Sequence, residues 1–243
     1  MKWQAMLHDI TLEPIASPRA QRADGAEARE RLLRAALRLF ADKGFAKAST
    51  REIAQAAGTN IAAISYYFGD KAGLYRASFR APSGAAGVEA DSFDRPALAL
   101  RESLQAFFRA FLEPLKQGEW AQLGTRLRLR EFLEPTGLLR DGLDQRIQPI
   151  HAGLSAVLCR ALGLAAPDDD VHRLAFAIVG LAMQPFVSRD AIDAIRPQLL
   201  ASPQAIDSSV QRLADYAQAM TEFEQRRRSA ADAEAVPPRR AAA

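Results

Sequence analysis

Cysteine is nearly absent from this chain: its 243 residues contain only Cys159, so no internal disulfide framework can form. We interpret this cysteine as a packing residue of an apolar helix, with redox sensing as the alternative. No apolar run approaches the 18 residues that a membrane span requires. The first residues, which include Lys2, His8 and Asp9, lack the pattern of a signal peptide. We therefore expect a cytoplasmic protein without a membrane segment.

The usual motifs of catalysis and metal binding are also missing. There is no HExxH, phosphate loop or GxGxxG, and His8, His151 and His172 lie far apart without the spacing of metal ligands. No useful stretch alternates polar and apolar residues with a period of two, so we expect no sheet. These absences favour an all-α protein that is not an enzyme and has no cofactor or metal.

Charge is unevenly distributed along the chain. Residues 1–80 carry 13 Lys and Arg against 8 Asp and Glu, a net charge of +5. Residues 81–243 carry 19 against 21, a net charge of −2. A basic N-terminal third is typical of a DNA-binding domain, although the charge alone is weak support.

The stretch from Ser49 to Tyr75 predicts a helix, a tight turn, a second short helix and the start of a third. Ser49 is placed to cap the first helix, with Glu52 three residues on completing a capping box. Gly58 stands where a helix stops in the left-handed conformation, and Asn60 is placed to cap the next helix.

The second short helix has two distinct faces. Ile61, Ile64 and Phe68 repeat at helical spacing and are expected to point inward. The opposite face is small and polar with one aromatic ring, which suits a helix that enters a DNA major groove. It consists of Ala62, Ala63, Ser65 and Tyr66.

About 55 residues, from Glu27 to about Phe79, resemble the DNA-binding domain of the TetR family of bacterial transcriptional regulators. The resemblance rests on a series of short motifs in a fixed order: LF, KGF, REIA, AG, YYF and a following lysine. Together these motifs are far more specific than a helix-turn-helix pattern alone. The run NIAAISYYFGDKAGLY is most similar to a CerR-like subgroup with its own helical C-terminal domain. The resemblance implies a three-helix DNA-binding head, a larger helical bundle and a homodimer.

The same resemblance implies which residues touch a DNA operator. Thr50 and Arg51 match positions that contact a phosphate and a base edge, with a solvated Arg51 as the alternative. Tyr66 and Tyr67 match an aromatic pair of the family, of which one tyrosine is expected to bond a phosphate while the other packs. Lys71 matches a phosphate-contacting lysine. The predicted DNA-binding residues are Thr50, Arg51, Asn60, Ala62, Ala63, Ser65, Tyr66, Tyr67 and Lys71.

Composition divides the chain into four parts. We expect a disordered arm over residues 1–26, the DNA-binding domain over 27–80, a helical domain over 95–228 and a disordered tail over 229–243, with a breaker-rich linker from residue 81 to about 94. Within the helical domain, periodicity predicts helices over residues 96–116, 119–134, 138–164, 168–188 and 202–228.

The last two long helices, Asp168–Ser188 and Ser202–Arg227, carry more apolar surface than one buried face requires. We expect them to form the homodimer as a four-helix bundle, and Leu213 is a candidate interface residue. An effector is expected between Ala97 and Phe186, with His151 and Arg130 as polar anchors. The candidate wall residues are Phe108, Phe111, Trp120, Leu127, Arg130, His151, Phe176 and Met183.

The sequence thus favours a ligand-responsive repressor that binds a palindromic operator as a homodimer. One alternative is a constitutive DNA-binding regulator whose second domain is solidly packed and binds no effector. The other is a helical protein-interaction module whose head no longer binds DNA.

Overall fold

The structure, a computed structural model, describes residues 18–80 and 88–235, with side chains for 24–80, 88–139 and 147–231. Every regular element in these ranges is a helix, which confirms the all-α fold class. The chain divides into two compact units, Met1–Arg80 and Ala81–Ala243. The expected arm before Pro18, the segment 81–87 of the expected linker and the tail after Ala235 lie outside the described residues.

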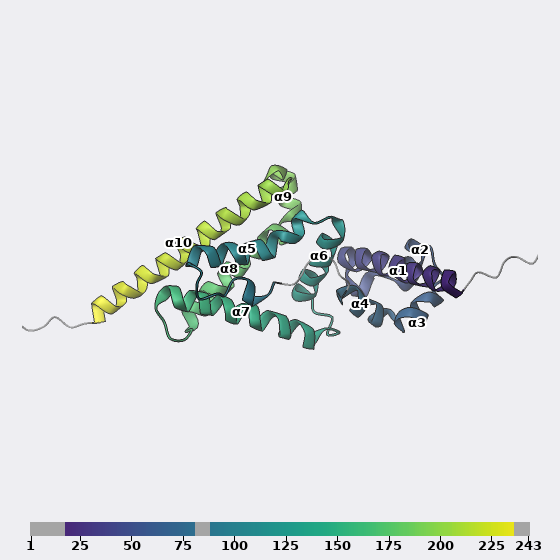
Figure 1. The fold of residues 1–243 in the computed structure, drawn as a ribbon, viewed down its shortest axis with the longest axis horizontal. Coiled ribbons are helices and arrows are strands. Elements are labelled where there is room, and N and C mark those ends of the chain that lie inside the picture. The colour runs from purple at the N-terminus through teal and green to yellow at the C-terminus, as the bar shows by residue number, and fades with distance from the viewer. Residues whose placement is uncertain (1–17, 81–87, 236–243) are drawn as a thin grey trace, which may run out of the picture. The chain divides into compact units, whose positions relative to one another are not determined.

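The described part of the first unit forms α1 (Pro18–Lys47), α2 (Thr50–Ala56), α3 (Ala62–Phe68) and α4 (Lys71–Arg80) (Figure 1). The boundary of the expected arm at residue 26 is wrong, because α1 already begins at Pro18. Proline suits the first turn of a helix, where its missing N–H is not needed, and the alanines and arginines that follow favour helix. Gly44, with a φ of 77°, interrupts the helical backbone near the end of α1.

The core of the first unit is aromatic. Phe40 on α1 meets Tyr75 on α4 edge to face, with ring centroids 5.0 Å apart, and Phe45 meets the same tyrosine at 5.1 Å. Phe40 and Tyr75 are almost fully buried, as are Leu32 on α1 and Ile53 on α2. These contacts hold α1, α2 and α4 together and leave α3 packed mainly against α4.

The second unit contains two short 3-10 turns and six α-helices within its described residues. They are η1 (Ala90–Ser92), α5 (Leu100–Lys116), α6 (Glu119–Leu133), α7 (Arg140–Leu162), α8 (Asp169–Val187), α9 (Arg189–Ile195), η2 (Pro197–Leu199) and α10 (Pro203–Ala235). Periodicity did not indicate α9 or η2, which are too short to show it. The helix expected over residues 96–116 starts later than predicted. It is α5, which begins at Leu100, where the carboxylate of Glu102 accepts a hydrogen bond from Ala99 N at 2.9 Å.

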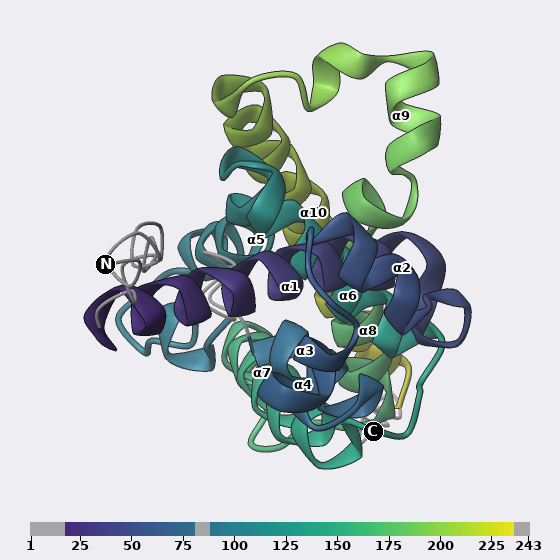
Figure 2. The same cartoon turned by 90° about the vertical axis from the view of Figure 1, so that its right-hand side faces the viewer.

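The longest helix, α10, lies against α5 (Figures 1 and 2). Phe107 and Phe108 of α5 and Val210 and Ala214 of α10 belong to one buried cluster with residues of α7 and α8. Lys116 on α5 bonds Asp207 on α10 at 2.6 Å along the edge of this contact. The tail expected from residue 229 is helical as far as Ala235, since alanine, serine and acidic residues let the helix continue without a breaker.

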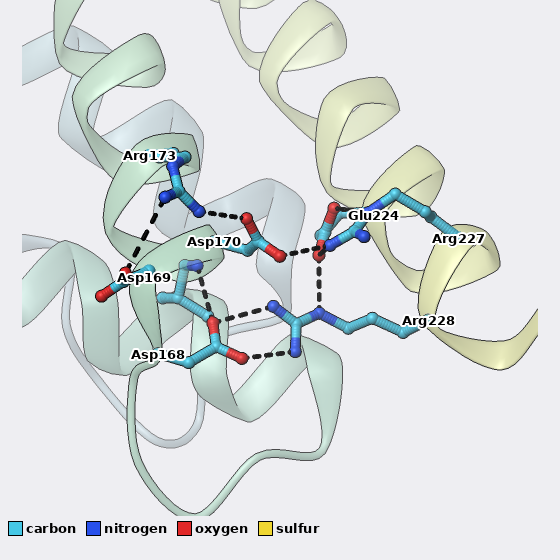
Figure 3. Close-up of polar contacts among 8 residues, drawn as sticks. Asp168, Asp169, Asp170, Arg173, Glu224, Arg227 and Arg228 are labelled. Atoms are coloured by element: carbon cyan, nitrogen blue, oxygen red, sulfur yellow. Dashed lines mark hydrogen bonds and ion pairs between the residues drawn. The ribbon is translucent and has the colours of Figure 1, made fainter. Parts of the chain in front are cut away.

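Seven charged side chains at the N-terminus of α8 and on α10 form the ionic cluster drawn in Figure 3. Arg228 donates two hydrogen bonds to Asp168, at 2.7 and 2.9 Å, and one to Glu224 at 2.6 Å. Arg227 bonds Asp170 at 2.5 Å and Glu224 at 2.8 Å. Bidentate guanidinium–carboxylate pairs are directional as well as attractive, so the cluster sets the spacing of α8 and α10.

Within the described residues, no single helix is long and apolar enough to cross a membrane. α8 and α9, bent by 62° at their break, meet the length and composition criteria only as a pair.

Candidate nucleic-acid interface

The turn between α2 and α3 is built as the sequence predicted. Gly58 has a φ of 61°, in the left-handed region that glycine adopts without strain. Its N–H bonds the carbonyl of Gln55 at 3.1 Å, and Thr59 N bonds Ala54 O at 2.9 Å, so the last carbonyls of α2 are satisfied. Asn60 Oδ1 accepts from Ala62 N at 3.0 Å and caps the start of α3.

The start of α2 differs from the expected capping box. Ser49 Oγ accepts a hydrogen bond from Glu52 N at 3.1 Å, which is the first half of the motif. The Glu52 carboxylate pairs with Lys43 of α1 instead of returning to the backbone of Ser49. Thr50 is half-buried and Arg51 is exposed in the same first turn, and within the described residues Arg51 makes no ion pair.

The short helix α3 presents the predicted outward face. Ala62, Ser65 and Tyr66 are exposed, Ala63 is half-buried, and Ile64 is buried on the opposite side. No acidic side chain lies on α3, which suits a surface that approaches phosphates.

Ile61 contradicts the predicted inward stripe, because its side chain is 48% exposed. Ile61 stands at the N-cap of α3 with a helical backbone, φ −55° and ψ −33°, but at this end of the short helix the described residues leave its side chain largely uncovered. Phe68 is only half-buried and carries the Arg29 guanidinium over its ring at 5.2 Å. The sequence did not single out Arg29.

The aromatic pair divides into one exposed and one packed ring. Tyr66 is 82% exposed, whereas Tyr67 is half-buried and meets both Tyr66 and Phe68 edge to face, at 4.8 and 6.3 Å. The hydroxyl of Tyr67 lies 3.2 Å from the point where Gly25 of α1 would carry a Cβ. The hydroxyl of Tyr66 is therefore the freer of the two to reach a ligand.

Lys71, the first residue of α4, is held against the end of α1. Its Nζ bonds the carbonyl of Ala46 at 3.4 Å and lies 4.5 Å from the centroid of the Phe45 ring. Partial burial lowers the pKa of this ammonium. The group has three N–H donors, so the bond to Ala46 leaves others for a phosphate.

The neighbouring residues of α4 have structural roles. Asp70 caps the helix: its Oδ1 accepts from Gly73 N at 2.6 Å and its carbonyl from Leu74 N at 3.0 Å. A Cβ at Gly73 would lie 2.0 Å from the carbonyl oxygen of Phe68, so only glycine fits where α4 passes the end of α3. A glycine inside a helical pattern was the available signal, since it costs stability unless packing requires it.

The eight candidate effector residues differ in burial. Phe108 and Leu127 are fully buried, and Phe111, Trp120, Arg130 and Met183 are half-buried. Arg130 pairs with Glu134 on its own helix at 3.2 Å. Two of the eight, His151 and Phe176, line a groove that runs between α7 and α8 and has a volume of about 760 Å³.

A pair of imidazoles that the sequence kept apart lies in this groove. His151 Nε2 on α7 is 2.9 Å from His172 Nδ1 on α8, a hydrogen bond in which one ring donates. Burial, and then the neighbouring imidazole, lower the pKa of His151. Among the residues that the structure describes, no three His, Cys, Asp or Glu side chains are grouped to hold a metal ion.

Two protein families match the chain. The family described as bacterial regulatory proteins of the TetR type matches residues 32–78, which span the second half of α1, all of α2 and α3 and most of α4. The C-terminal domain of the HTH-type transcriptional dual regulator CecR matches residues 100–223, about half of the chain. The second match identifies the C-terminal domain as that of CecR, and this name replaces the term CerR-like that we used for the subgroup.

Individual relatives agree with these families. An HTH-type transcriptional dual regulator CecR from Shigella flexneri is 32% identical over 167 residues, 64% of this chain and 74% of the relative. An HTH-type transcriptional repressor from Mycobacterium tuberculosis is 28% identical over 188 residues, 77% of this chain and 95% of the relative.

Solved structures share the fold. The hemolysin II transcriptional regulator HlyIIR superposes with a TM-score of 0.53 at 18% identity, over 73% of this chain and 97% of that one. A TetR-like transcriptional regulator from Rhodococcus sp. RHA1 superposes with a TM-score of 0.51 at 21% identity, over 79% of this chain and 96% of that one.

Proposed function

Because the chain belongs to the TetR family of bacterial transcriptional regulators, with a CecR-type C-terminal domain, we propose that it is a ligand-responsive repressor acting as a homodimer on a palindromic operator. The family consists of regulators and not of enzymes. The location that fits a regulator of bacterial genes is the cytoplasm, where the chromosome lies.

The main support for the proposed DNA-binding surface is the exposed face of α3, which contains no acidic residue. Ala62, Ala63 and Ser65 leave room for the helix to approach base edges, and the exposed Tyr66 hydroxyl can donate to a phosphate. Two carboxylates of this unit are engaged, Glu52 with Lys43 and Asp70 with the N-terminus of α4. Because their negative charges are partly compensated, both carboxylates repel the phosphates of DNA less than unpaired ones would.

Four further residues frame this face. Arg51 is exposed on α2 and offers a planar fork of donors for a guanine edge. Thr50 and Asn60 stand at the starts of the two helices, where hydroxyl and amide groups reach phosphates once DNA is present. Lys71 adds positive charge beside the end of α3 and positions the head without reading sequence.

An operator titration against salt tests this surface. With about six to eight phosphates neutralised per dimer, the slope of log affinity against log salt should be roughly −5 to −7. Lys71→Ala should weaken all DNA sequences alike and make the slope shallower. Arg51→Ala should erode discrimination at one base pair per half-site, by about 1–3 kcal/mol. Equal losses on operator and random DNA would remove Arg51 as a base reader.

The dimer is proposed to form through the helices Asp168–Ser188 and Ser202–Arg227, now α8 and α10. Phe176 on α8 is 62% exposed, and Tyr216 and Phe223 on α10 are 52% and 62% exposed. A groove of about 520 Å³ between the two helices is lined by five apolar side chains, which include Leu174 and Phe223, and by four charged residues of the ionic cluster. Large apolar side chains beside such a groove support burial against a second copy, because a two-fold interface presents the same patch twice.

Leu213 is a poorer interface residue than the sequence indicated, since it is partly buried against the core of its own unit. Phe223→Glu is therefore the sharper test: light scattering should show monomers at concentrations where the wild-type protein is dimeric. The matched control is Phe132→Glu, the same exchange at a 45% exposed position on α6. A stable dimer in the Phe223 variant would remove α10 from the interface.

The proposed mechanism uses two arrangements of the dimer. One arrangement places the two α3 helices in successive major grooves, about 34–36 Å apart for one-turn spacing. An effector that binds the other arrangement better lowers operator affinity, and DNA must weaken effector binding by the same factor. The first relative is named a dual regulator and the second a repressor. A reporter assay on the operator should therefore show repression, and activation is the outcome that it has to exclude.

A further inference from the structure

The groove between α7 and α8 has an unusual wall of stacked rings. The His151 ring lies 4.4 Å from that of Phe176 at an interplanar angle of 28°, and 5.2 Å from that of His172 at 15°. Alanine, leucine and proline side chains supply much of the remaining wall. At about 760 Å³ the groove falls within the range of small-molecule sites.

Two side chains of this wall contain buried polar atoms without a hydrogen-bond partner among the described residues. They are His151 Nδ1 and the Oγ of Ser155, which is 3% exposed. The two residues are four positions apart on α7, and so lie one turn apart on the same face. A buried donor or acceptor without a partner is costly, and native proteins keep few of them without a reason.

The charged groups that the structure describes at the groove and its rim are paired. Arg160 on its rim bonds Asp94 at 2.6 Å, and Asp168, beyond the groove residue Pro167, is held by Arg228. Burial keeps the pKa of His151 low, so this imidazole stays neutral at physiological pH. A charged ligand would find no free counter-charge among the groove residues whose side chains the structure describes, whereas a neutral one loses little on entering.

We propose that the α7–α8 groove is the effector site, and that its ligand is a neutral planar aromatic molecule carrying a hydroxyl group. A hydroxyl both donates and accepts, so it can pair with Ser155 Oγ and with either tautomer of His151. The ligand ring packs against the exposed Phe176 ring and the apolar wall of the groove, which leaves its hydroxyl free to reach the edge of the His151 imidazole. This inference rests on the proposed ligand response, and it moves the site away from the buried Phe108 and Leu127.

The test uses full-length protein without DNA and three probes: 1-naphthol, naphthalene and 1-naphthoate. Calorimetry should show 1-naphthol binding, and Ser155→Ala should weaken it about five- to tenfold, the loss expected for one hydrogen bond. Naphthalene should bind more weakly and equally to both proteins. The matched control is Ser103→Ala, which removes an equally buried and unpartnered hydroxyl on α5, outside this groove, and should leave the 1-naphthol affinity unchanged.

Both alanine variants should fold, because each removes a polar atom that has no partner in the part of the chain that the structure describes, and circular dichroism checks this. The proposal is overturned if 1-naphthol does not bind up to millimolar concentration, if Ser155→Ala leaves its affinity unchanged, or if 1-naphthoate binds more tightly. Operator binding is a separate assay. Naphthol binding with the predicted variant pattern supports the groove even if the operator is not released, and that second result contradicts only the proposed regulatory response.

Discussion

Gly73→Ala is predicted to destabilise the DNA-binding unit although it replaces a helical glycine by the best helix former. At an unobstructed helix position this exchange stabilises by about 1 kcal/mol. At Gly73 the new Cβ would lie 2.0 Å from the carbonyl oxygen of Phe68, far inside the separation of about 3.0 Å that such atoms keep. The neighbouring atom belongs to the backbone, so relief requires the end of α3 to move away from α4.

The magnitude follows from the two opposing effects. Overpacking of this severity costs about 3 kcal/mol, the upper end of the usual range, and helix propensity returns about 1. A net loss of about 2 kcal/mol corresponds to a Tm lower by about 8–16 °C for a unit of this size. Since Phe68 is the last residue of α3, operator affinity should fall at least tenfold as well.

Calorimetry and fluorescence anisotropy on operator DNA measure the two effects. The control is Ala77→Gly, the reverse exchange on the same helix, which should cost about 1 kcal/mol from propensity. If packing governs Gly73, both exchanges lower Tm. If Gly73→Ala raises Tm by about as much as Ala77→Gly lowers it, propensity alone is acting and the close contact with Phe68 is refuted.

Three further predictions follow from particular contacts. Gly58→Val should lower Tm and abolish operator binding, since the left-handed φ of 61° costs about 1–2 kcal/mol or more for a β-branched residue. Gly58→Asn should be nearly neutral, and equal Tm values for the Val and Asn variants would contradict the turn geometry. Tyr66→Phe should weaken operator binding about three- to tenfold and Tyr67→Phe should not, because only the first hydroxyl is well exposed; the reverse order in an anisotropy assay would reassign the phosphate contact. In the cluster of Figure 3 the pKa values of Asp168, Asp170 and Glu224 are lowered in the folded state by hydrogen bonds from arginines, above all by the one from Arg228 to Asp168. The stabilisation is therefore complete above the unfolded pKa of about 4 and is lost as pH falls through the folded pKa values. Urea unfolding should therefore show a steep loss of stability between about pH 4 and 2 in wild-type protein and a shallower one in Arg228→Leu; identical slopes would show that the cluster does not stabilise the contact between α8 and α10.

The sequence by itself determined the helix-turn-helix, because that element is encoded by short-range rules. A serine or asparagine caps a helix through its own backbone neighbours, and a glycine ends one through its own φ, so Ser49, Gly58 and Asn60 could be interpreted without knowing the rest of the fold. The all-α class followed from periodicity in the same way. The helix boundaries at Pro18 and Ala235 were missed because polar, alanine-rich ends carry no apolar period.

Tertiary structure decided every feature that depends on a distant partner. Glu52 was expected to close a capping box until the fold brought Lys43 beside it, and Gly73 became irreplaceable only where α4 passes the end of α3. His151 and His172, 21 positions apart, became one hydrogen-bonded pair because α7 and α8 pack side by side. Periodicity tells which helix face is apolar, but not whether the chain itself or a second copy covers it, and that is why Leu213 and Phe223 could be separated only by the packing of α10 on α5.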